Sequence, residues 1–321
     1  MKMKLKKLST YQPVKAFKKD GVISIFILWV IAVTVLMSAG ISYRAYMELR
    51  SFRFYRERFY ARNLIWRGFM QSLELLRLDY ENNSGIDGLS EEWSKDNIEF
   101  QNEYGISQIR IEDEERKINI NQIAREENLD VLNNLFPPKL AQSIIDWVDE
   151  DSFQNYYYGG EQENYYNFLT YNCRNSNIRS LYEIKYIKGC PSDFNLKDLE
   201  NQITTIGSEV NINTVSEVCL KKLELPDSLV SEILEFRQHN GVFNSIPDSD
   251  SISEIFPKIA SADIVEQWNV LRNYFKVSSQ YFRIYIIAQT ERGVKRCAQA
   301  LVQRKGSSFD ILSWQENFWE K

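Results

Sequence analysis

KKDGVISIFILWVIAVTVLMSAGISYR, residues 18–44, joins a basic leader to a long apolar segment through a single glycine, Gly21. From Val22 to Tyr43 the chain carries no charged residue over 22 positions. At a helical rise of about 1.5 Å per residue this segment reaches roughly 33 Å, enough for a hydrocarbon core of about 30 Å. A secretory signal peptide has a shorter apolar core, about 7 to 15 residues, followed by a cleavage site of small residues. The segment therefore predicts a transmembrane helix that stays on the chain.

The charges on either side of the apolar segment indicate its orientation. Seven lysines precede it: Lys2, Lys4, Lys6, Lys7, Lys15, Lys18 and Lys19. By the positive-inside rule they keep the N-terminus in the cytoplasm and send the rest of the chain across the membrane. Five arginines follow the segment and weaken this bias: Arg44, Arg50, Arg53, Arg56 and Arg58. We expect a single-pass protein with its bulk on the far side of the membrane.

The composition is that of an ordinary globular protein, with 321 residues of which 44% are hydrophobic and 26% charged. The net charge is −5 although the leader holds seven lysines, so the exported part is more acidic than the whole chain. Since non-specific affinity for nucleic acid comes mainly from Lys and Arg, no nucleic acid partner is expected. In an oxidising compartment Cys173 and Cys190 could form a disulfide, whereas Cys219 and Cys297 stand in apolar contexts typical of buried free thiols.

Beyond the membrane segment, the spacing of apolar residues predicts an α+β fold. Residues 44–80 contain no proline and have apolar side chains near helical spacing, so the helix should continue out of the membrane. Residues 104–113 are typical of a strand, and residues 277–314 of a three-stranded antiparallel meander. The stretch between them is mostly helical and would be an insertion. The expected parts are a leader (1–21), the transmembrane helix (22–43), a long helix with the first strand (44–115), the insertion (116–270) and the meander (271–321).

The expected insertion contains two related segments. KININ (117–121) precedes one helical pair, and VNIN (210–213) precedes a second. This repetition predicts two diverged copies of one unit similar to a helix-hairpin-helix. In the second copy, Asn213 or Thr214 is suited to cap the following helix, and Gly241 to end the next helix in a left-handed turn.

Several motifs, in a fixed order, give the chain a resemblance to a known family. They are Gly21 before the apolar segment, Trp93, EERKININ (114–121), SIIDWVDED (143–151), GGEQENYY (159–166), VNINT (210–214) and YFRIYIIA (281–288). With these motifs the chain resembles the general secretion pathway K proteins, the large minor pseudopilins of type II secretion. The resemblance implies a pilin-like α+β domain with a large helical insertion, in a protein that is not an enzyme and has no catalytic residues.

The resemblance also implies a cellular role. Prepilin peptidase would cut after Gly21 and leave Val22 as the mature, methylated N-terminus, with the chain anchored in the inner membrane and its bulk in the periplasm. The protein would join the I and J minor pseudopilins at the tip of the pseudopilus, capping it and helping to initiate it during protein export. Pilin-like proteins usually have Glu at the fifth mature position, where this chain has Phe26. A carboxylate in the bilayer persists only with a partner, so its absence fits a subunit at a filament end.

An acidic stretch, DWVDEDSFQNYYYGGEQENYY (146–166), is the candidate metal site. Its carboxylates are Asp146, Asp149, Asp151, Glu161 and Glu163, and hard oxygen ligands on a loop suit Ca²⁺. An EF-hand is excluded, because a loop that begins at Asp149 would have Gln154 at the position of the turn glycine and Gly160 at that of the final acid. The resemblance implies calcium bound by Asp149, Asp151 and either Glu161 or Glu163. Asp146 lies a helical turn earlier, where a cap or salt bridge is the alternative role.

A membrane-anchored DNA receptor of the competence type, built from helix-hairpin-helix units, is the alternative function. Its hairpins would need flexible backbone amides to hold phosphate, but FPPK (136–139) and ELPD (224–227) stand where Gly-x-Gly would be expected. A hydrolase is disfavoured because no HExxH, GxSxG or Walker pattern occurs. The only histidine, His239, lies near an expected helix C-terminus, where a cation is favourable.

Overall fold

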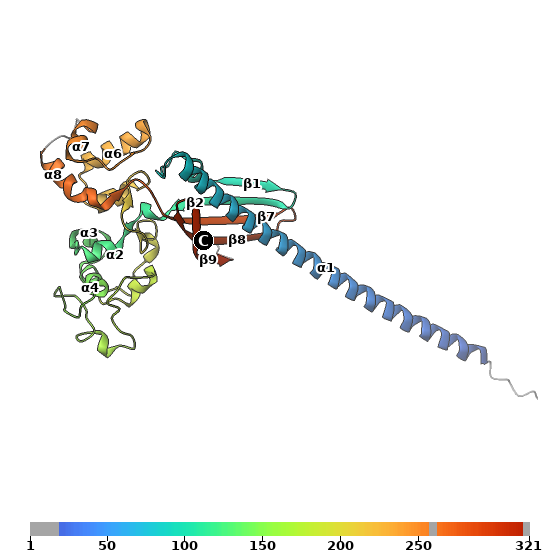
Figure 1. Cartoon of the computed structure of the whole chain (residues 1–321). Coiled ribbons are helices and arrows are strands. Elements are labelled where there is room, and N and C mark those ends of the chain that lie inside the picture. Colours follow the sequence, from blue (N-terminus) through green and yellow to red (C-terminus); the bar gives the residue numbers. More distant parts are fainter. Residues whose placement is uncertain (1–18, 257–261, 317–321) are drawn as a thin grey trace, which may run out of the picture. The chain divides into compact units, whose positions relative to one another are not determined.

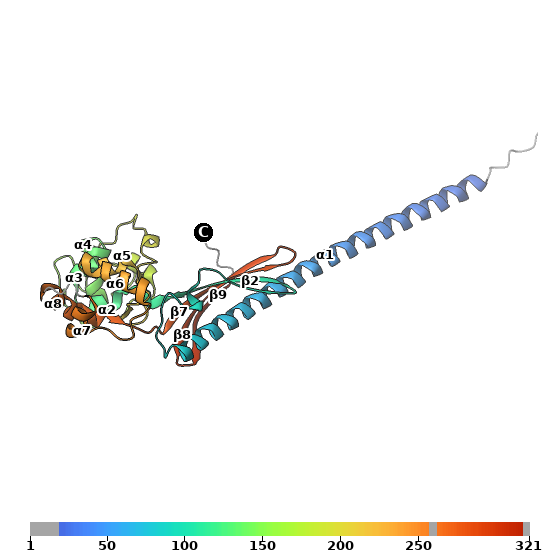
Figure 2. The same cartoon turned by 90° about the horizontal axis from the view of Figure 1, so that it is seen from above.

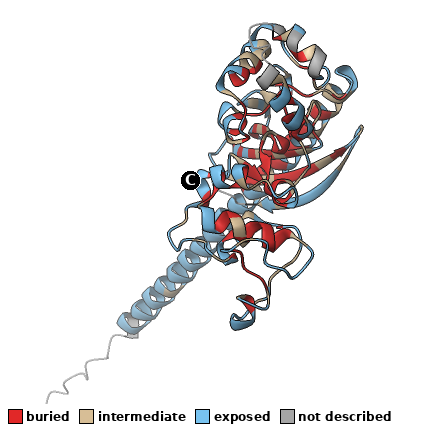
Figure 3. Ribbon diagram, turned by 90° about the vertical axis from the view of Figure 1, so that its left-hand side faces the viewer, coloured by how far each residue is buried: buried red, intermediate tan, exposed pale blue. Residues whose placement is uncertain are grey.

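The computed structural model describes residues 19–256 and 262–316, and the chain divides into two compact units, Met1–Arg58 and Phe59–Lys321. Helix α1 (Lys19–Asn82) begins in the first unit and ends in the second (Figure 1). In the first unit its large apolar side chains, such as Val22 and Phe26, are exposed (Figure 3). Within the described ranges, α1 is the helix that is long and apolar enough to cross a membrane, and the predicted span lies inside it. Residues 1–18 of the predicted leader lie outside the described residues.

The second unit contains a five-stranded antiparallel sheet with the strand order β1-β2-β7-β8-β9. The strands are β1 (Ile98–Asn102), β2 (Gly105–Asp113), β7 (Tyr281–Thr290), β8 (Lys295–Lys305) and β9 (Ser308–Glu316). The predicted first strand is β2 and the predicted meander is β7 to β9, so both expectations are confirmed. The edge strand β1 was not predicted, because its five residues are mixed in polarity. Its conformation depends on the pairing with β2, which runs from Ile98↔Ile109 to Asn102↔Gly105.

The C-terminal part of α1 packs on the sheet through an apolar face. Leu64, Phe69 and Leu76 are at most 2% exposed and share a core with residues of β2, β7 and β8. Ser107 of β2 adds a polar contact, because its Oγ donates to the backbone oxygen of Leu64 at 2.9 Å. Removing one of these buried leucine side chains typically costs about 2–5 kcal/mol. Burial against the sheet therefore contributes much of the stability of this end of α1.

Between β2 and β7 the chain forms a mainly helical insertion. Its helices are α2 (Ile120–Arg125), α3 (Leu129–Leu135), α4 (Pro138–Val148), α5 (Glu217–Lys222), α6 (Asp227–Asn240), α7 (Ser249–Ile255) and α8 (Ala262–Leu271), which lie together in Figures 1 and 2. Its short strands are β3 (Ile118–Asn119), β4 (Ile203–Thr204), β5 (Val210–Asn211) and β6 (Phe275–Lys276). The insertion has its own core, which includes Ile118, Ile144, Leu220 and Trp268. The α+β class predicted from the sequence is confirmed.

Two equivalent pairs of short strands join distant segments of the insertion. β3 pairs with β4 and β5 pairs with β6, both in parallel. Beside each bridge a buried asparagine holds a distant backbone segment. Asn121 accepts from the Ile178 N–H and donates to the oxygen of the same residue, and Asn213 does both with Phe243. These matching contacts support the predicted duplication.

The two expectations about helix ends in the second copy had different outcomes. The prediction for Gly241 is confirmed, since it follows α6 with a φ of +87°, in the left-handed region. The prediction that Asn213 or Thr214 caps the next helix is wrong. Ser216 caps α5, because its Oγ accepts from the Cys219 N–H at 3.2 Å.

The four cysteines are free thiols. Cys219 and Cys297 are buried, as predicted. Cys173 and Cys190 are half-buried and do not form the disulfide that was considered from the sequence. The structure therefore relies on packing and hydrogen bonds around the acidic loop.

Candidate metal centre

Helix α4 brings the first two acidic residues of the loop together. It begins at Pro138, whose fixed φ suits the first turn of a helix. Asp146 lies in its last turn and is 0% exposed, and Asp149 follows as the C-cap residue. The last turn of α4 contains no basic residue. Both carboxylates therefore stand at the negative end of the helix dipole without a compensating charge in that turn.

The loop after α4 folds back so that Glu161 joins the two aspartates. The Asn155 N–H donates to Asp146 Oδ1 at 3.1 Å, and Asn155 Nδ2 donates to Asp149 Oδ2 at 2.9 Å. A Cβ on Gly159 would lie 1.9 Å from Asp146 Oδ2, so the close approach of the loop requires glycine. Glu161, two residues later, is 1% exposed. One oxygen from each of the three carboxylates lies within 4.8 Å of the others.

Each of these carboxylates has a buried oxygen without a hydrogen-bond partner. These oxygens are Asp146 Oδ2, Asp149 Oδ1 and Glu161 Oε1. Asn175 has a fourth such oxygen, Oδ1, and its side chain also contacts Glu161 through a hydrogen bond. A buried acceptor that is left unpaired costs about 1–3 kcal/mol. Four of them among neighbouring side chains indicate a site for a ligand that accepts lone pairs, as a cation does.

The pKa values of the three acids agree with a site that attracts positive charge. Burial raises the pKa of Asp146 to about 6. Burial and the charge of Glu161 raise the pKa of Asp149 to about 7, and burial and the charge of Asp146 raise the pKa of Glu161 to about 7. Near neutral pH the cluster therefore holds either protons or a cation.

The donor atoms fit a hard cation of the calcium type. Ca²⁺ takes six to eight oxygens at about 2.3–2.6 Å, so two ligands on opposite sides of the ion stand about 5 Å apart. The separation of the three carboxylate oxygens falls within this range. The nearby thiol of Cys173 is a poor ligand, because burial raises its pKa to about 12 and keeps it protonated.

Three of the five predicted acids are brought together, and two are not. Asp146, Asp149 and Glu161 form the cluster, whereas Asp151 and Glu163 are exposed. Asp151 accepts from the Phe153 N–H at 2.7 Å and acts on the cluster through its charge. The structure thus favours Glu161 over Glu163, which the sequence could not separate, and gives Asp146 a position inside the cluster.

Sequence reasoning missed Asn155 and Asn175. Asn155 holds Asp146 and Asp149, and Asn175 contacts Glu161 from a backbone with a φ of +44°. Asparagine tolerates this left-handed conformation better than most residues. The string RNSN (174–177) could therefore have indicated a tight turn near the acidic loop.

A long apolar helix packed on an antiparallel sheet, with a helical insertion between two of its strands, is a pilin-like α+β architecture. The same fold occurs in a chain of the crystal structure of the GspK-GspI-GspJ complex from the type 2 secretion system of enterotoxigenic Escherichia coli. The TM-score is 0.65 at 18% sequence identity, and the match covers 85% of this chain and 100% of that chain. No protein-family model and no curated protein matches the sequence. The resemblance to K-type pseudopilins deduced from the motifs is thus confirmed at the level of the fold.

Proposed function

We propose that this chain is a K-type minor pseudopilin of type II secretion. The observation that carries the proposal is the fold shared over the full length of a chain from the GspK-GspI-GspJ complex. Helix α1 adds support, because its apolar segment could anchor such a subunit in the inner membrane with the bulk of the chain in the periplasm. The role is structural and not enzymatic: the protein caps the pseudopilus and helps to initiate it.

The sequence of α1 supports a location at the tip of the filament. Phe26 is 63% exposed on α1, at the position where pilin-like subunits usually have a glutamate. A subunit without this carboxylate cannot pair with the N-terminal amine of a neighbour, so it suits a terminal position. We propose that the I and J minor pseudopilins are its partners there, after prepilin peptidase has cut between Gly21 and Val22.

Purification of the complex tests this assignment. The full chain, co-expressed with the I and J minor pseudopilins of the same cell and extracted in detergent, should purify with both as a stable assembly. Failure to bind either partner, together with salt-dependent retention on a DNA column, would favour the helix-hairpin-helix alternative. The α5–α6 hairpin argues against that alternative, because Asp227 occupies the first turn of α6, where a phosphate would have to bind.

We further propose that Asp146, Asp149 and Glu161 bind Ca²⁺, with the Asn175 amide oxygen as a fourth protein donor. The support is the set of four unpaired buried oxygens on these residues. At a calcium concentration 100 times the Kd, binding would stabilise the folded chain by about 2.7 kcal/mol. For a unit of this size such a gain raises Tm by several degrees.

Glu161→Gln and Glu163→Gln form a matched pair for this proposal. Glu161→Gln should abolish the rise in Tm with calcium, and it should stabilise the calcium-free chain because it removes one of three repelling charges. Glu163→Gln, the same change at an exposed position, should keep the wild-type response. Differential scanning calorimetry of the full chain in detergent measures both effects. A wild-type Tm that does not respond to calcium would contradict the site.

A further inference from the structure

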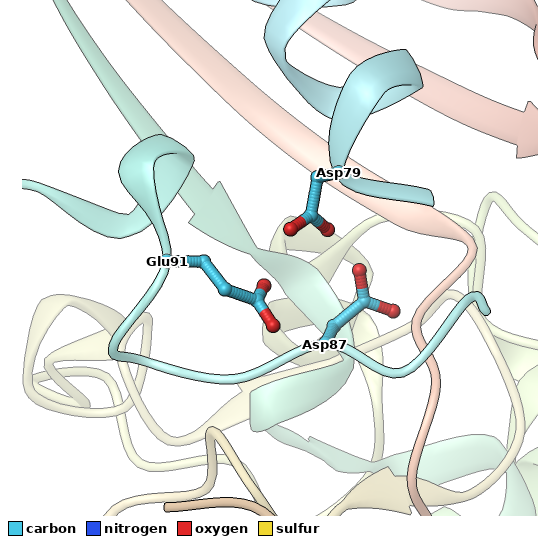
Figure 4. A group of neighbouring side chains, drawn as sticks. All are labelled: Asp79, Asp87 and Glu91. Carbon is cyan, nitrogen blue, oxygen red and sulfur yellow. The ribbon is translucent and has the colours of Figure 1, made fainter. Parts of the chain in front are cut away.

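A second group of carboxylates lies outside the insertion, where α1 meets the sheet domain. Asp79 comes from the last turn of α1, and Asp87 and Glu91 from the loop that leads to β1. One oxygen of each lies within 4.8 Å of the others. Figure 4 shows the three carboxylates pointing toward one another.

Asp87 is the most deeply buried of the three, at 0% exposure. Its Oδ2 accepts from Arg304 Nη2 at 2.5 Å and from the Ser279 N–H at 2.6 Å. Its Oδ1 is buried and has no hydrogen-bond partner. The Asp87 carboxylate faces the other two acids. A buried acceptor without a partner requires an explanation, and a ligand shared by the three acids would provide one.

Asp79 and Glu91 place carboxylate oxygens close to those of Asp87. Asp79 Oδ1 accepts from Asn83 Nδ2 at 2.7 Å, and the Asp79 carboxyl also shares a hydrogen bond with the Glu91 carboxyl inside the group. Glu91 Oε2 accepts from the indole Nε1 of Trp93, which is 1% exposed, at 2.5 Å. The contacts with Asn83 and Trp93 fix both carboxylates from outside the group, as neighbouring residues do for metal ligands.

The charges near the group are not balanced. Arg304 pairs with Asp87, which leaves the negative charges of Asp79 and Glu91, while buried Asp113 adds a further repulsion on Asp87. The last turn of α1 contains no basic residue, so its carbonyl end contributes partial negative charge. Burial raises the pKa of Glu91 to about 8 and that of Asp87 to about 7. The group therefore takes up positive charge near neutral pH, as a proton or as a metal ion.

We propose that Asp79, Asp87 and Glu91 form a second divalent cation site, which takes Ca²⁺ and links the end of α1 to the loop before β1. Calcium suits it better than Mg²⁺, because Ca²⁺ accepts irregular sets of oxygens at about 2.3–2.6 Å whereas Mg²⁺ requires near-octahedral ligands at about 2.0–2.1 Å. The site shares no residue with the acidic loop of the insertion, so it stands independently of the proposed function.

Glu91→Gln and Glu92→Gln are a matched pair of variants that test this site. Glu91 lies in the group, and its neighbour Glu92 is exposed and pairs with Lys95 on the surface. Equilibrium dialysis of the full chain in detergent against radioactive calcium gives the number of ions bound. Glu91→Gln should bind about one ion fewer per chain than the wild type, and Glu92→Gln should bind as many. Calcium binding by Glu91→Gln equal to the wild type would overturn the site and leave a shared proton as the occupant.

Terbium provides a second measurement that does not depend on the folding of Glu91→Gln. Trp93 should sensitise the emission of Tb³⁺ bound beside Glu91, whereas Trp147 would do so at the insertion site. In Asp149→Asn, which disables the insertion site, emission excited through tryptophan should persist and should disappear on adding Trp93→Phe. Loss of all emission in Asp149→Asn alone would also overturn the site. Because the two sites are disabled by different variants, failure of one is distinguishable from failure of the other.

Discussion

Replacing Arg304 with methionine should destabilise the sheet domain strongly, because Arg304 is a buried cation. It is 3% exposed, and its Nη2 donates to Asp87 Oδ2 at 2.5 Å and to the Ser279 oxygen at 2.6 Å. Its guanidinium carbon also lies 5.0 Å from the ring centroid of Tyr80 and 4.9 Å from that of Phe282. Methionine keeps most of the apolar stem, so the change removes mainly the charge and the donors.

The expected loss depends on the ionisation of Asp87. Breaking a buried ion pair by removing one partner costs about 3–5 kcal/mol, and we expect about 4 kcal/mol at pH 8. Burial outweighs the attraction of Arg304 and raises the pKa of Asp87 to about 7, above its unfolded value. Ionised Asp87 therefore costs stability as pH rises through about 7, and Arg304 offsets part of that cost. At about pH 5 the carboxyl is protonated, so the loss should be smaller.

Urea unfolding of the full chain in detergent, followed by tryptophan fluorescence, measures this loss at both pH values. Lys305→Met is the matched control, since the next residue is exposed and pairs with Asp310 at the surface. The control should change the free energy of unfolding little. A loss below about 1 kcal/mol for Arg304→Met at pH 8, or equal losses at the two pH values, would refute the argument from buried charge.

Three further predictions concern the acidic loop and the processing of the chain. Gly159→Ala should abolish calcium-dependent stabilisation because its Cβ would displace Asp146, whereas Gly160→Ala, which meets the movable side chain of Lys188, should keep most of it in thermal unfolding. Without calcium, the free energy of unfolding should fall from about pH 5 to about pH 7, in part because the loop acids have raised folded-state pKa values, and calcium bound at the loop should make this fall smaller. Equal pH slopes with and without calcium would count against the loop site. Gly21→Trp should leave an unprocessed, longer chain by mass spectrometry, and normal cleavage would contradict the cleavage position.

Much of the fold follows from local sequence patterns. The uncharged run after Gly21, the alternation in β2 and the three segments of the meander can each be recognised from neighbouring residues alone. β1 lacks such a pattern and forms because β2 supplies its hydrogen bonds. The helix cap at Ser216 was missed because asparagine is also a common capping residue. Asn213 instead uses its side chain to accept a buried hydrogen bond from the Phe243 N–H.

The candidate sites were less predictable, because they depend on how loops fold back. The acidic loop was visible as a concentration of carboxylates, but the selection of Glu161 over Glu163 depends on which side chain turns inward. The group of Asp79, Asp87 and Glu91 has no recognisable spacing along the chain. The group forms because the loop after α1 folds back beside the last turn of that helix, and local sequence does not reveal such a tertiary contact.

The position of the insertion between two paired strands affects the order in which the protein folds. Arg283 of β7 donates to Glu114, just after β2, across 169 residues of chain. For an unstructured loop of this length, closure costs roughly 4.5 kcal/mol in entropy before the strands gain any contact. The insertion has its own core and its own parallel bridges, so it can fold first and bring its two ends together. We therefore expect the centre of the sheet to assemble late, when β2 and β7 meet across an insertion that is already compact.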